Sequence, residues 1–404
     1  QSLMSARLDY RLVDTPAAFH EAAGALAHGR GPFAVDTERA SSFRYGDRAF
    51  LVQVARRGAG TFLIAPEGHR DEVREIFAPV LGGQEWIIHA ASEDLRSLAL
   101  LGLHPGVLFD TELASRLVGY DRPNLAAMVE RFVGVELEKG HGHEDWSRTP
   151  LPKSWQDYAA LDVEYLNELA EALTEVLDAE GKLRWAFEEF AHLISVYSLT
   201  PRPVKSWRDM KGISSLRDQS GLQVARELWH AREEISEQRD IAPGRLLPNR
   251  ALLDIALAEP DSPRGLTRAV GGKGMPSREV RRWLGVVERA LAADPATWPR
   301  RKDPRANGTP SKSGWERHYP ESWQMLQLCR EDIAASAEDL DIRPDILLTP
   351  AILRETVWNA PDNGPAWDTH QAASALKKAG ARPWQVELTA PILAAAHAEM
   401  LELV

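Results

Sequence analysis

The chain has 404 residues, 44% hydrophobic side chains and a formal net charge of −11. This length is too great for one hydrophobic core and predicts two or three domains. The single cysteine, Cys329, excludes a disulfide framework and a cysteine-based zinc site, and it suits a reducing compartment.

No apolar run resembles a signal peptide or is long enough to cross a bilayer. We therefore expect a soluble, cytoplasmic protein that has no membrane partner. The acidic balance argues against nucleic-acid binding, which prefers basic surfaces. It does not exclude such binding, because bound cations offset carboxylates and contacts depend on local basic patches.

Residues 1–110 alternate short apolar runs with turns and helical patterns, which is typical of an α/β domain. Brief turns at 44–48 and 57–60 predict an antiparallel meander of the first three runs. Helical patterns at 71–81 and 95–101 predict that the later strands are added in parallel. We expect a mixed sheet of about five strands covered by helices. The predicted strands are 33–36, 50–55, 61–65, 86–90 and 107–110.

From Thr111 onward the pattern is almost wholly helical. Residues 155–179 predict one long amphipathic helix. The Thr-Pro-Arg-Pro stretch at 200–203 interrupts the helical pattern and predicts a domain boundary. The segment 294–321 is rich in proline, glycine and serine, and it predicts a linker.

Two segments on either side of this linker are similar at an offset of 101 residues. Each follows an amphipathic helix and continues with Ile-x-Pro, a Leu-Leu pair and another helical pattern. We interpret them as two copies of one small all-α module. The matched pairs are Ile241 and Ile342, Pro243 and Pro344, Leu246 and Leu347, Leu247 and Leu348, and Leu252 and Leu353.

Asp36 and Glu38 end the apolar run 33–35. Alternate positions on a strand put both side chains on the same face. Carboxylates beside a buried strand are costly unless they are paired or bind a metal. A structural alternative stays open, since strand ends often carry acidic residues.

Tyr158 and Asp162 lie four residues apart in a helical stretch, and so share one helix face. An exposed helical turn is the alternative for this pair. Asp94 follows the strand at 86–90 where a helix begins, a place where Asp94 or Glu93 would also be favoured by the helix dipole. If Asp94 joins the other carboxylates, their charge requires divalent cations, as in two-metal cleavage of phosphodiesters.

Other polar residues give weaker signals. His141 and His143 have a spacing that suits a metal, but no third ligand lies nearby in the sequence, which favours a mobile or substrate-facing loop. Asp110 closes a strand, and we interpret it as structural, with a role in organising the acidic cluster. Trp146 and Trp155 are interpreted as packing residues.

The sequences DTE (36–38), HAASEDL (89–95) and YAALDVEYL (158–166), in this order and spacing, resemble the three exonuclease motifs of the DEDD superfamily. The tyrosine four residues before the last aspartate resembles the DEDDy branch. FDTELA (109–114), with the later Asp-Trp and Pro-Leu pairs, is similar to the ribonuclease D family. The repeated helical modules resemble helicase-and-RNase-D C-terminal (HRDC) domains, which that family carries in two copies.

This resemblance implies an α/β domain followed by all-α domains. The first would be an RNase H-like exonuclease domain with a mixed five-stranded sheet, and two helical HRDC-type domains would follow it. The implied boundaries are 1–200 for the DEDDy 3′–5′ exonuclease domain, 201–293 for the first HRDC domain, 294–321 for a basic linker and 322–404 for a second HRDC-like domain.

The resemblance also implies the chemistry of a hydrolase that releases nucleoside 5′-monophosphates from RNA. Asp36, Glu38, Asp94 and Asp162 would hold two divalent ions, Mg²⁺ or Mn²⁺, which suit all-oxygen ligands. Tyr158 would orient the attacking water, because a tyrosine with a pKa of ~10 is a poor base.

The expected partner is RNA with a single-stranded 3′ end, such as a tRNA precursor, and no obligate protein partner is inferred. Residues 300–317 contain six basic and two acidic residues, which predicts an arm that holds the RNA backbone. A 3′–5′ DNA exonuclease and a catalytically silent RNA-binding scaffold are the alternatives. The predicted nucleic-acid contacts are Arg44, Tyr45, Gln53, Arg300, Arg301 and Lys302, with surface or sheet packing as the alternative for the first three.

Overall fold

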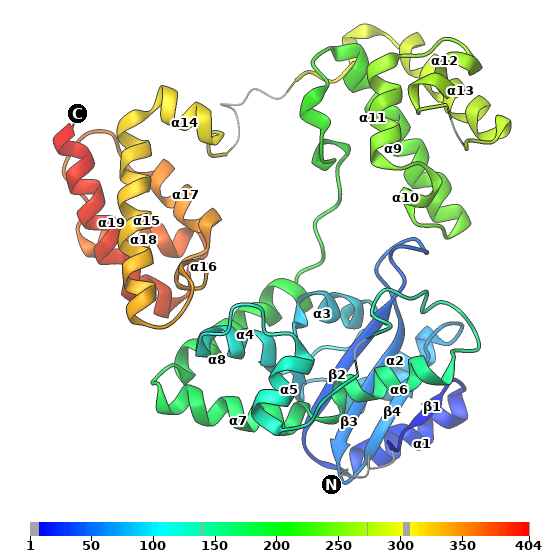
Figure 1. Ribbon diagram of the computed structural model, residues 1–404, viewed down its shortest axis with the longest axis vertical. Helices are drawn as coiled ribbons and strands as arrows, with labels where there is room; N and C mark the ends of the chain where they lie inside the picture. The colour runs from blue at the N-terminus through cyan, green and yellow to red at the C-terminus, as the bar shows by residue number, and fades with distance from the viewer. Residues whose placement is uncertain (1–7, 139, 273, 302–307, 404) are drawn as a thin grey trace. The chain divides into compact units, whose positions relative to one another are not determined.

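The computed structural model describes residues 8–138, 140–272, 274–301 and 308–403 (Figure 1). The chain divides into two compact units. The first unit takes in the described parts of Gln1–Glu38, Ala49–Pro201 and Pro304–Val404. The second consists of Arg39–Arg48 and the described part of Arg202–Asp303, so a loop from the N-terminal region groups with the middle of the chain.

A six-stranded mixed sheet forms the centre of the first unit, in the order β1-β4-β3-β2-β5-β6. β2 pairs in parallel with β5, β5 with β6, and β1 with β4, while β3 and β4 are antiparallel. The mixed sheet is confirmed, but the predicted number of five strands omits β1, which is only three residues long. The strands are β1 Arg11–Val13, β2 Arg30–Arg39, β3 Ala49–Arg57, β4 Gly60–Ile64, β5 Glu85–Ile88 and β6 Val107–Asp110.

Helices pack against this sheet and close its core. α6 crosses β3 and β4, and α1 packs on β4 and α2 (Figure 1). Phe19, Phe33, Phe77 and Trp86 are fully or almost fully buried between the layers. The helices are α1 Pro16–Ala27, α2 Arg70–Leu81, α3 Ala91–Leu100, α4 Thr111–Val118, α5 Leu125–Val133, α6 Lys153–Glu164, α7 Leu166–Ala179 and α8 Leu183–Leu193, followed by the π-helix η1 Ile194–Ser198.

The long helix predicted over 155–179 is two helices in the structure, which is a correction. Tyr165 separates them with backbone angles of φ −113° and ψ 9°. The two halves pack on different surfaces, because α6 lies on β3 and β4 whereas α7 lies on α4, α5 and β5. The hydrophobic periodicity of the sequence cannot predict where the helix is interrupted, because the interruption depends on which surfaces the two halves pack against in the tertiary structure.

The second unit is a small helical bundle with its own core. Trp283, Leu228, Leu252 and Ile255 are fully buried in it. The loop 39–48 belongs to this unit, and the backbone N–H of Ala242 donates to the carbonyl of Phe43 over 3.1 Å. Its elements are η2 Trp207–Asp209, η3 Ile213–Ser215, α9 Gln219–Arg239, α10 Pro243–Leu246, α11 Asn249–Ala258, α12 Pro263–Ala269, α13 Ser277–Ala292 and η4 Pro295–Thr297.

The C-terminal helices of the first unit repeat the element order of that bundle. α15, α16 and α17 begin 101 residues after α9, α10 and α11, which is the offset of the sequence repeat. The predicted linker 294–321 is too long, because α14 lies inside it and buries Trp315. The helices are α14 Lys312–His318, α15 Pro320–Asp339, α16 Pro344–Leu347, α17 Pro350–Trp358, α18 Thr369–Lys378 and α19 Pro383–Leu403.

Buried polar contacts attach these C-terminal helices to the rest of the first unit. Glu189 of α8 accepts two hydrogen bonds from the Arg382 guanidinium at 2.8 and 3.0 Å and one from the Trp384 indole at 2.9 Å. Trp185 stacks on Trp384 with ring centroids 4.7 Å apart. Glu189 and Trp384 are buried, so these contacts are shielded from water.

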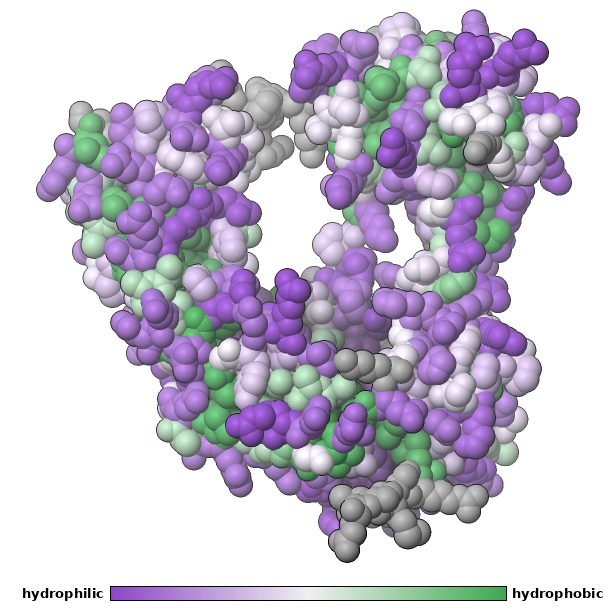
Figure 2. Space-filling model, in the orientation of Figure 1, coloured by the Kyte–Doolittle hydropathy of each residue, from purple (hydrophilic) through white to green (hydrophobic). Residues whose placement is uncertain are grey.

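The surface carries no large apolar band on the face drawn in Figure 2, where hydrophobic residues are scattered among hydrophilic ones. Among the described residues, no helix has the length and apolar character that spanning a membrane requires.

Candidate active site

β2 carries the first two predicted site residues. Phe33, Ala34 and Val35 are buried in the strand, and Asp36 and Glu38 follow at alternate positions. The carboxylates therefore emerge on the same face, as the period of a strand requires. The backbone N–H of Thr37 donates to the Asp36 Oδ1 over 2.9 Å, which fixes the Asp36 carboxylate.

α6 brings Asp162 to these two carboxylates. Ligand oxygens of Asp36, Glu38 and Asp162 all lie within 4.8 Å of one another. Tyr158 lies one turn earlier on the same helix and so shares its face with Asp162. The structure thus brings together residues from the N-terminal strand and from a helix more than a hundred positions later.

Asp94 approaches the cluster from the first turn of α3. Its side chain is buried, and the hydroxyl of Thr37 donates to Asp94 Oδ1 over 2.5 Å. The charge of Asp94 is the strongest of the neighbouring charges that raise the pKa of Asp36. Asp94 therefore lies beside the three grouped carboxylates and is linked to β2 through Thr37.

Gln53 of β3 lies beneath the carboxylates. It is fully buried, and its amide nitrogen donates to Glu38 over 3.2 Å and reaches Asp36 at 3.5 Å. Full burial does not fit the predicted contact of Gln53 with a nucleotide. Its neutral amide instead holds two of the acidic side chains in place, a role that sequence reasoning missed.

Burial and mutual repulsion raise the pKa values of the cluster. The pKa of Asp36 is well above its usual range because of burial and then the charges of Asp94, Asp162 and Glu38. Burial, together with the charge of Asp94, raises the pKa of Asp162 to about 7. Such shifts mean that the negative charges lack full compensation from the protein itself.

An aromatic wall surrounds Tyr158. Trp146 stacks on the Tyr158 ring at 6.4 Å, Trp155 lies 5.5 Å from Trp146, and His141 meets the Tyr158 ring edge-on at 5.7 Å. Burial, followed by the charges of Asp162, Glu38 and Asp36, raises the pKa of Tyr158. Its hydroxyl therefore keeps its proton at neutral pH and can donate a hydrogen bond.

This wall was only partly foreseeable. The packing role predicted for Trp146 and Trp155 is confirmed, but its place beside Tyr158 was missed. The spacing of three residues between Trp155 and Tyr158 on one helix was the available signal. A Cβ atom on Gly142 would lie 3.5 Å from the Tyr158 hydroxyl, so the loop backbone passes close to it.

A cavity of about 380 Å³ opens beside Tyr158 and Asp162. Leu125, Leu137 and Leu161 supply an apolar lining, and Asn124 and Glu138 add polar groups. Small-molecule sites commonly combine an apolar lining with a few polar groups in this way. The cavity shares a wall with the acidic cluster through Asp162.

Three family models match successive parts of the chain. Residues 10–178 match the family described as 3′-5′ exonuclease, residues 221–286 match the HRDC domain, and residues 308–397 match the 3′ to 5′ exonuclease C-terminal domain. A ribonuclease D from Pseudomonas paraeruginosa is 31% identical over 336 residues, which cover 82% of this chain and 85% of that protein. The chain belongs to the ribonuclease D family.

Solved structures share the fold of this chain. A protein from Bifidobacterium adolescentis is 33% identical, with a TM-score of 0.85 over 96% of this chain and 97% of the solved chain. Escherichia coli RNase D, at 23% identity, shares the fold with a TM-score of 0.68 over 92% of this chain and 98% of the solved chain. As a ribonuclease D, the protein is a hydrolytic 3′–5′ exoribonuclease, and its substrate is RNA.

The DEDD exonuclease fold of ribonuclease D implies divalent metal ions, and the residues present fit them. Three carboxylates offer oxygens within 4.8 Å of one another, and hard divalent cations prefer oxygen ligands. The raised pKa values of Asp36 and Asp162 show that positive charge at this place would be stabilising. Asp36, Glu38 and Asp162 would hold the metal, with Asp94 beside them.

The other described residues with a predicted nucleic-acid contact belong to the second unit. Arg44 and Tyr45 belong to the second unit, where the Arg44 guanidinium contacts Asp240 at 3.1 Å and the Tyr45 hydroxyl donates to Glu233 over 3.0 Å. Arg300 and Arg301 are exposed. Lys302 lies outside the described residues. For these residues, nucleic-acid binding stays a prediction.

Proposed function

We propose that this ribonuclease D removes nucleotides one at a time from the single-stranded 3′ ends of structured RNAs such as tRNA precursors, and releases nucleoside 5′-monophosphates. The observation that carries the proposal is the grouping of Asp36, Glu38 and Asp162 beside Tyr158 and beside the 380 Å³ cavity. The cavity is within the range of small-ligand sites, and it adjoins the carboxylates on the side of Tyr158.

We propose two divalent ions, Mg²⁺ or Mn²⁺, held by Asp36, Glu38, Asp94 and Asp162. When bound, such ions activate water and stabilise the charge that develops on the leaving 3′ oxygen. The protein's own residues hold the metal-binding carboxylates in position. Thr37 fixes Asp94, and Gln53 fixes Glu38, so that the oxygen ligands are preorganised.

In this proposal Tyr158 orients the attacking water and does not take its proton. Its raised pKa leaves the hydroxyl protonated, so it donates a hydrogen bond. The aromatic wall of Trp146, Trp155 and His141 limits the positions of the Tyr158 ring. A fixed donor next to the carboxylates sets the direction from which water reaches the phosphate.

The test is a product assay on a tRNA precursor with a 3′ extension, with and without a chelator. We expect mononucleotides from the 3′ end only when Mg²⁺ or Mn²⁺ is present. An Asp36→Asn protein should still bind the RNA but release no nucleotide. Internal cleavage products, or release that survives chelation, would contradict the proposed reaction.

The relatives favour an exoribonuclease over the two alternatives of a DNA exonuclease and a silent scaffold. Preference for RNA depends on contacts to the 2′-hydroxyl. Competition between RNA and DNA strands of the same sequence tests the first alternative, and the product assay tests the second. Equal processing of both strands would point to a less selective nuclease.

We further propose that the basic segment 300–317 holds the RNA backbone while the exonuclease domain works on the 3′ end. Arg300 and Arg301 are exposed, which suits phosphate contacts, and the predicted partner Lys302 is next to them in the sequence. We retain Arg44 and Tyr45 as proposed nucleic-acid contacts, although Asp240 and Glu233 already engage their polar groups.

We also propose the domain limits 1–200, 201–293 and 322–404, with a linker that runs from residue 294 to the start of α14 at Lys312. The HRDC match at 221–286 supports the first helical domain. The shared helix order and spacing support descent of the C-terminal helices from the same module. Its different family match fits divergence of this copy.

A further inference from the structure

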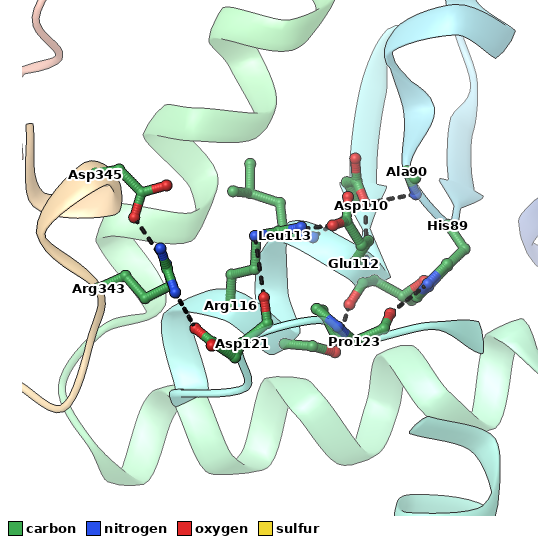
Figure 3. A network of polar contacts seen from close by, with 12 residues as sticks. His89, Ala90, Asp110, Glu112, Leu113, Arg116, Asp121, Pro123, Arg343 and Asp345 are labelled. Carbon is green, nitrogen blue, oxygen red and sulfur yellow. Dashed lines mark hydrogen bonds and ion pairs between the residues drawn. The ribbon is translucent and has the colours of Figure 1, made fainter. Parts of the chain in front are cut away.

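We propose that Asp110 is a positioning residue that holds the first turn of α3, and through it the metal ligand Asp94. This inference rests on the proposed metal-dependent function, and it assigns a task to a residue outside the proposed set of metal ligands. Asp110 ends β6, and its buried carboxylate is part of the network in Figure 3, beside Ala90, Glu112 and Leu113.

The Asp110 carboxylate accepts hydrogen bonds from the starts of two helices. Oδ1 accepts from the backbone N–H of Ala90 at 3.0 Å, and Oδ2 accepts from that of Ala91 at 2.9 Å. Oδ1 also accepts from Glu112 at 2.9 Å and from Leu113 at 3.2 Å. One side chain thus caps α4, its own helix, and also α3, which belongs to another segment.

α3 depends on this outside cap because its own N-cap residue is an alanine. Ala90 has no side-chain acceptor, and no side-chain cap bond forms from it. It also has left-handed backbone angles, φ 62° and ψ 66°, which are uncommon for a residue with a Cβ atom. A backbone in this conformation persists only where surrounding contacts determine it. Asp110 supplies such contacts by accepting hydrogen bonds from the backbone N–H groups of Ala90 and Ala91.

His89 secures the same junction from the other side. Its Nδ1 lies 2.8 Å from the Thr111 hydroxyl, and its Nε2 lies 2.8 Å from the Pro123 carbonyl (Figure 3). The register of the parallel strands β5 and β6 pairs Ile88 with Asp110. The sheet itself therefore places Asp110 beside the point where the chain leaves β5 for α3.

The consequence for the site is geometric. Asp94 is in the first turn of α3, so its backbone moves with the residues that Asp110 holds. Thr37 fixes the Asp94 carboxylate from β2, and Asp110 fixes the helix that presents it. Residues that orient metal ligands in this way typically change metal affinity or activity by roughly 10- to 100-fold when they are substituted.

Asp110→Asn tests the proposal with a small change. The amide oxygen can still accept from Ala90, Glu112 and Leu113, but the amide nitrogen then faces the Ala91 N–H and cannot accept from it. We expect the dissociation constant for Mn²⁺, measured by calorimetry without RNA, to rise by roughly tenfold or more. Nucleotide release should fall at limiting Mn²⁺ and recover at saturating Mn²⁺, whereas Asp94→Asn should not recover.

Asp368→Asn is the matched control, because Asp368 caps α18 by accepting from the Gln371 N–H at 2.7 Å and lies outside the acidic cluster. It should bind Mn²⁺ like the wild type. An Asp110→Asn protein with a lower melting temperature but wild-type Mn²⁺ affinity would overturn the proposal, since the role would then be structural alone.

Two further measurements cover other outcomes. If Asp110→Asn does not fold, Asp110→Ser is the second variant. The serine hydroxyl can still cap α4 but is too short to reach the Ala91 N–H. Its dissociation constant for Mn²⁺ is measured by the same calorimetry. Hydrogen exchange on the metal-free wild type needs no variant. The Ala91 amide should exchange as slowly as the Leu113 amide, because Asp110 accepts a hydrogen bond from each. Fast exchange at Ala91 would show that Asp110 does not fix the start of α3. A wild type that binds Mn²⁺ but releases no nucleotides would contradict the proposed function and leave the calorimetric comparison valid.

Discussion

Removing divalent cations with a chelator leaves Asp162 partly buried among like charges. Its pKa is raised from an ordinary value near 3.8 to about 7, mainly by burial and then by Asp94. The pKa of Asp36 is raised as well, by burial and by the neighbouring carboxylates. The stability of the metal-free protein should therefore depend on pH in a direction that these shifts fix.

Between pH 4 and about 7 the folded protein holds a proton on Asp162 that the unfolded chain releases. Stability falls with rising pH wherever the folded state binds more protons. The contribution is fully present below about pH 4 and is lost as the pH rises through about 7. At about 1.4 kcal/mol for each pKa unit, the loss is on the order of 4 kcal/mol, or roughly 5 °C in melting temperature.

The assay is thermal unfolding in chelator between pH 5 and pH 8, for the wild type and for Asp162→Asn. The wild-type midpoint should fall more steeply with pH, because asparagine does not titrate. Mn²⁺ should raise the wild-type midpoint more at pH 8 than at pH 6. Asp178→Asn, at an exposed position of α7, is the control and should behave like the wild type. Identical pH profiles for wild type and Asp162→Asn would refute the reasoning.

Three further predictions concern other parts of the molecule. Tyr158→Phe removes the water-orienting hydroxyl and should slow single-turnover nucleotide release roughly 100-fold at saturating metal, with unchanged Mn²⁺ affinity. Arg382→Ala leaves the buried Glu189 without its ion-pair partner and should lower the free energy of unfolding by about 3–5 kcal/mol in denaturant titrations. Replacing Arg300, Arg301 and Lys302 by neutral residues should weaken RNA binding and reduce the slope of log affinity against log salt by about 2.

Each of these predictions has an outcome that would contradict it. A Tyr158→Phe enzyme with a wild-type rate would remove the tyrosine from the mechanism. Arg184→Ala is the control for Arg382, because its contact with Glu387 is exposed and should contribute at most about 1 kcal/mol. Equal losses of unfolding free energy in Arg382→Ala and Arg184→Ala would show that the burial of Glu189 does not determine how much its ion pair contributes to stability. An unchanged salt slope would exclude the basic arm.

The parts of the site that follow from local periodicity were predictable from the sequence. Asp36 and Glu38 share a face because a strand repeats every two residues, and Tyr158 and Asp162 do so because a helix repeats in under four. The fold brings these two pairs together in space, and the spacing of residues along the chain does not predict that they meet. The resemblance to DEDD exonucleases supplied that step, and the grouping of Asp36, Glu38 and Asp162 is what the structure adds.

What escaped prediction depends on contacts between distant segments. β1 is three residues long and is recognisable only through its parallel pairing with β4. Gln53 looks like an ordinary polar residue in an apolar strand until its neighbours on β2 are known. The second cap formed by Asp110 requires the register of β5 and β6. In each case the deciding partner is remote in sequence.

Neutral groups are among the supports of the acidic cluster. The Thr37 backbone and the Gln53 amide hold Asp36, and the Thr37 hydroxyl holds Asp94. Neutral donors fix the geometry of a carboxylate without cancelling its charge, whereas a lysine or arginine at the same distance would lower its pKa and compete with a metal ion. The repulsion left in the metal-free protein is therefore relieved when cations bind. The like charges that destabilise the metal-free protein at neutral pH thus also provide its affinity for divalent ions.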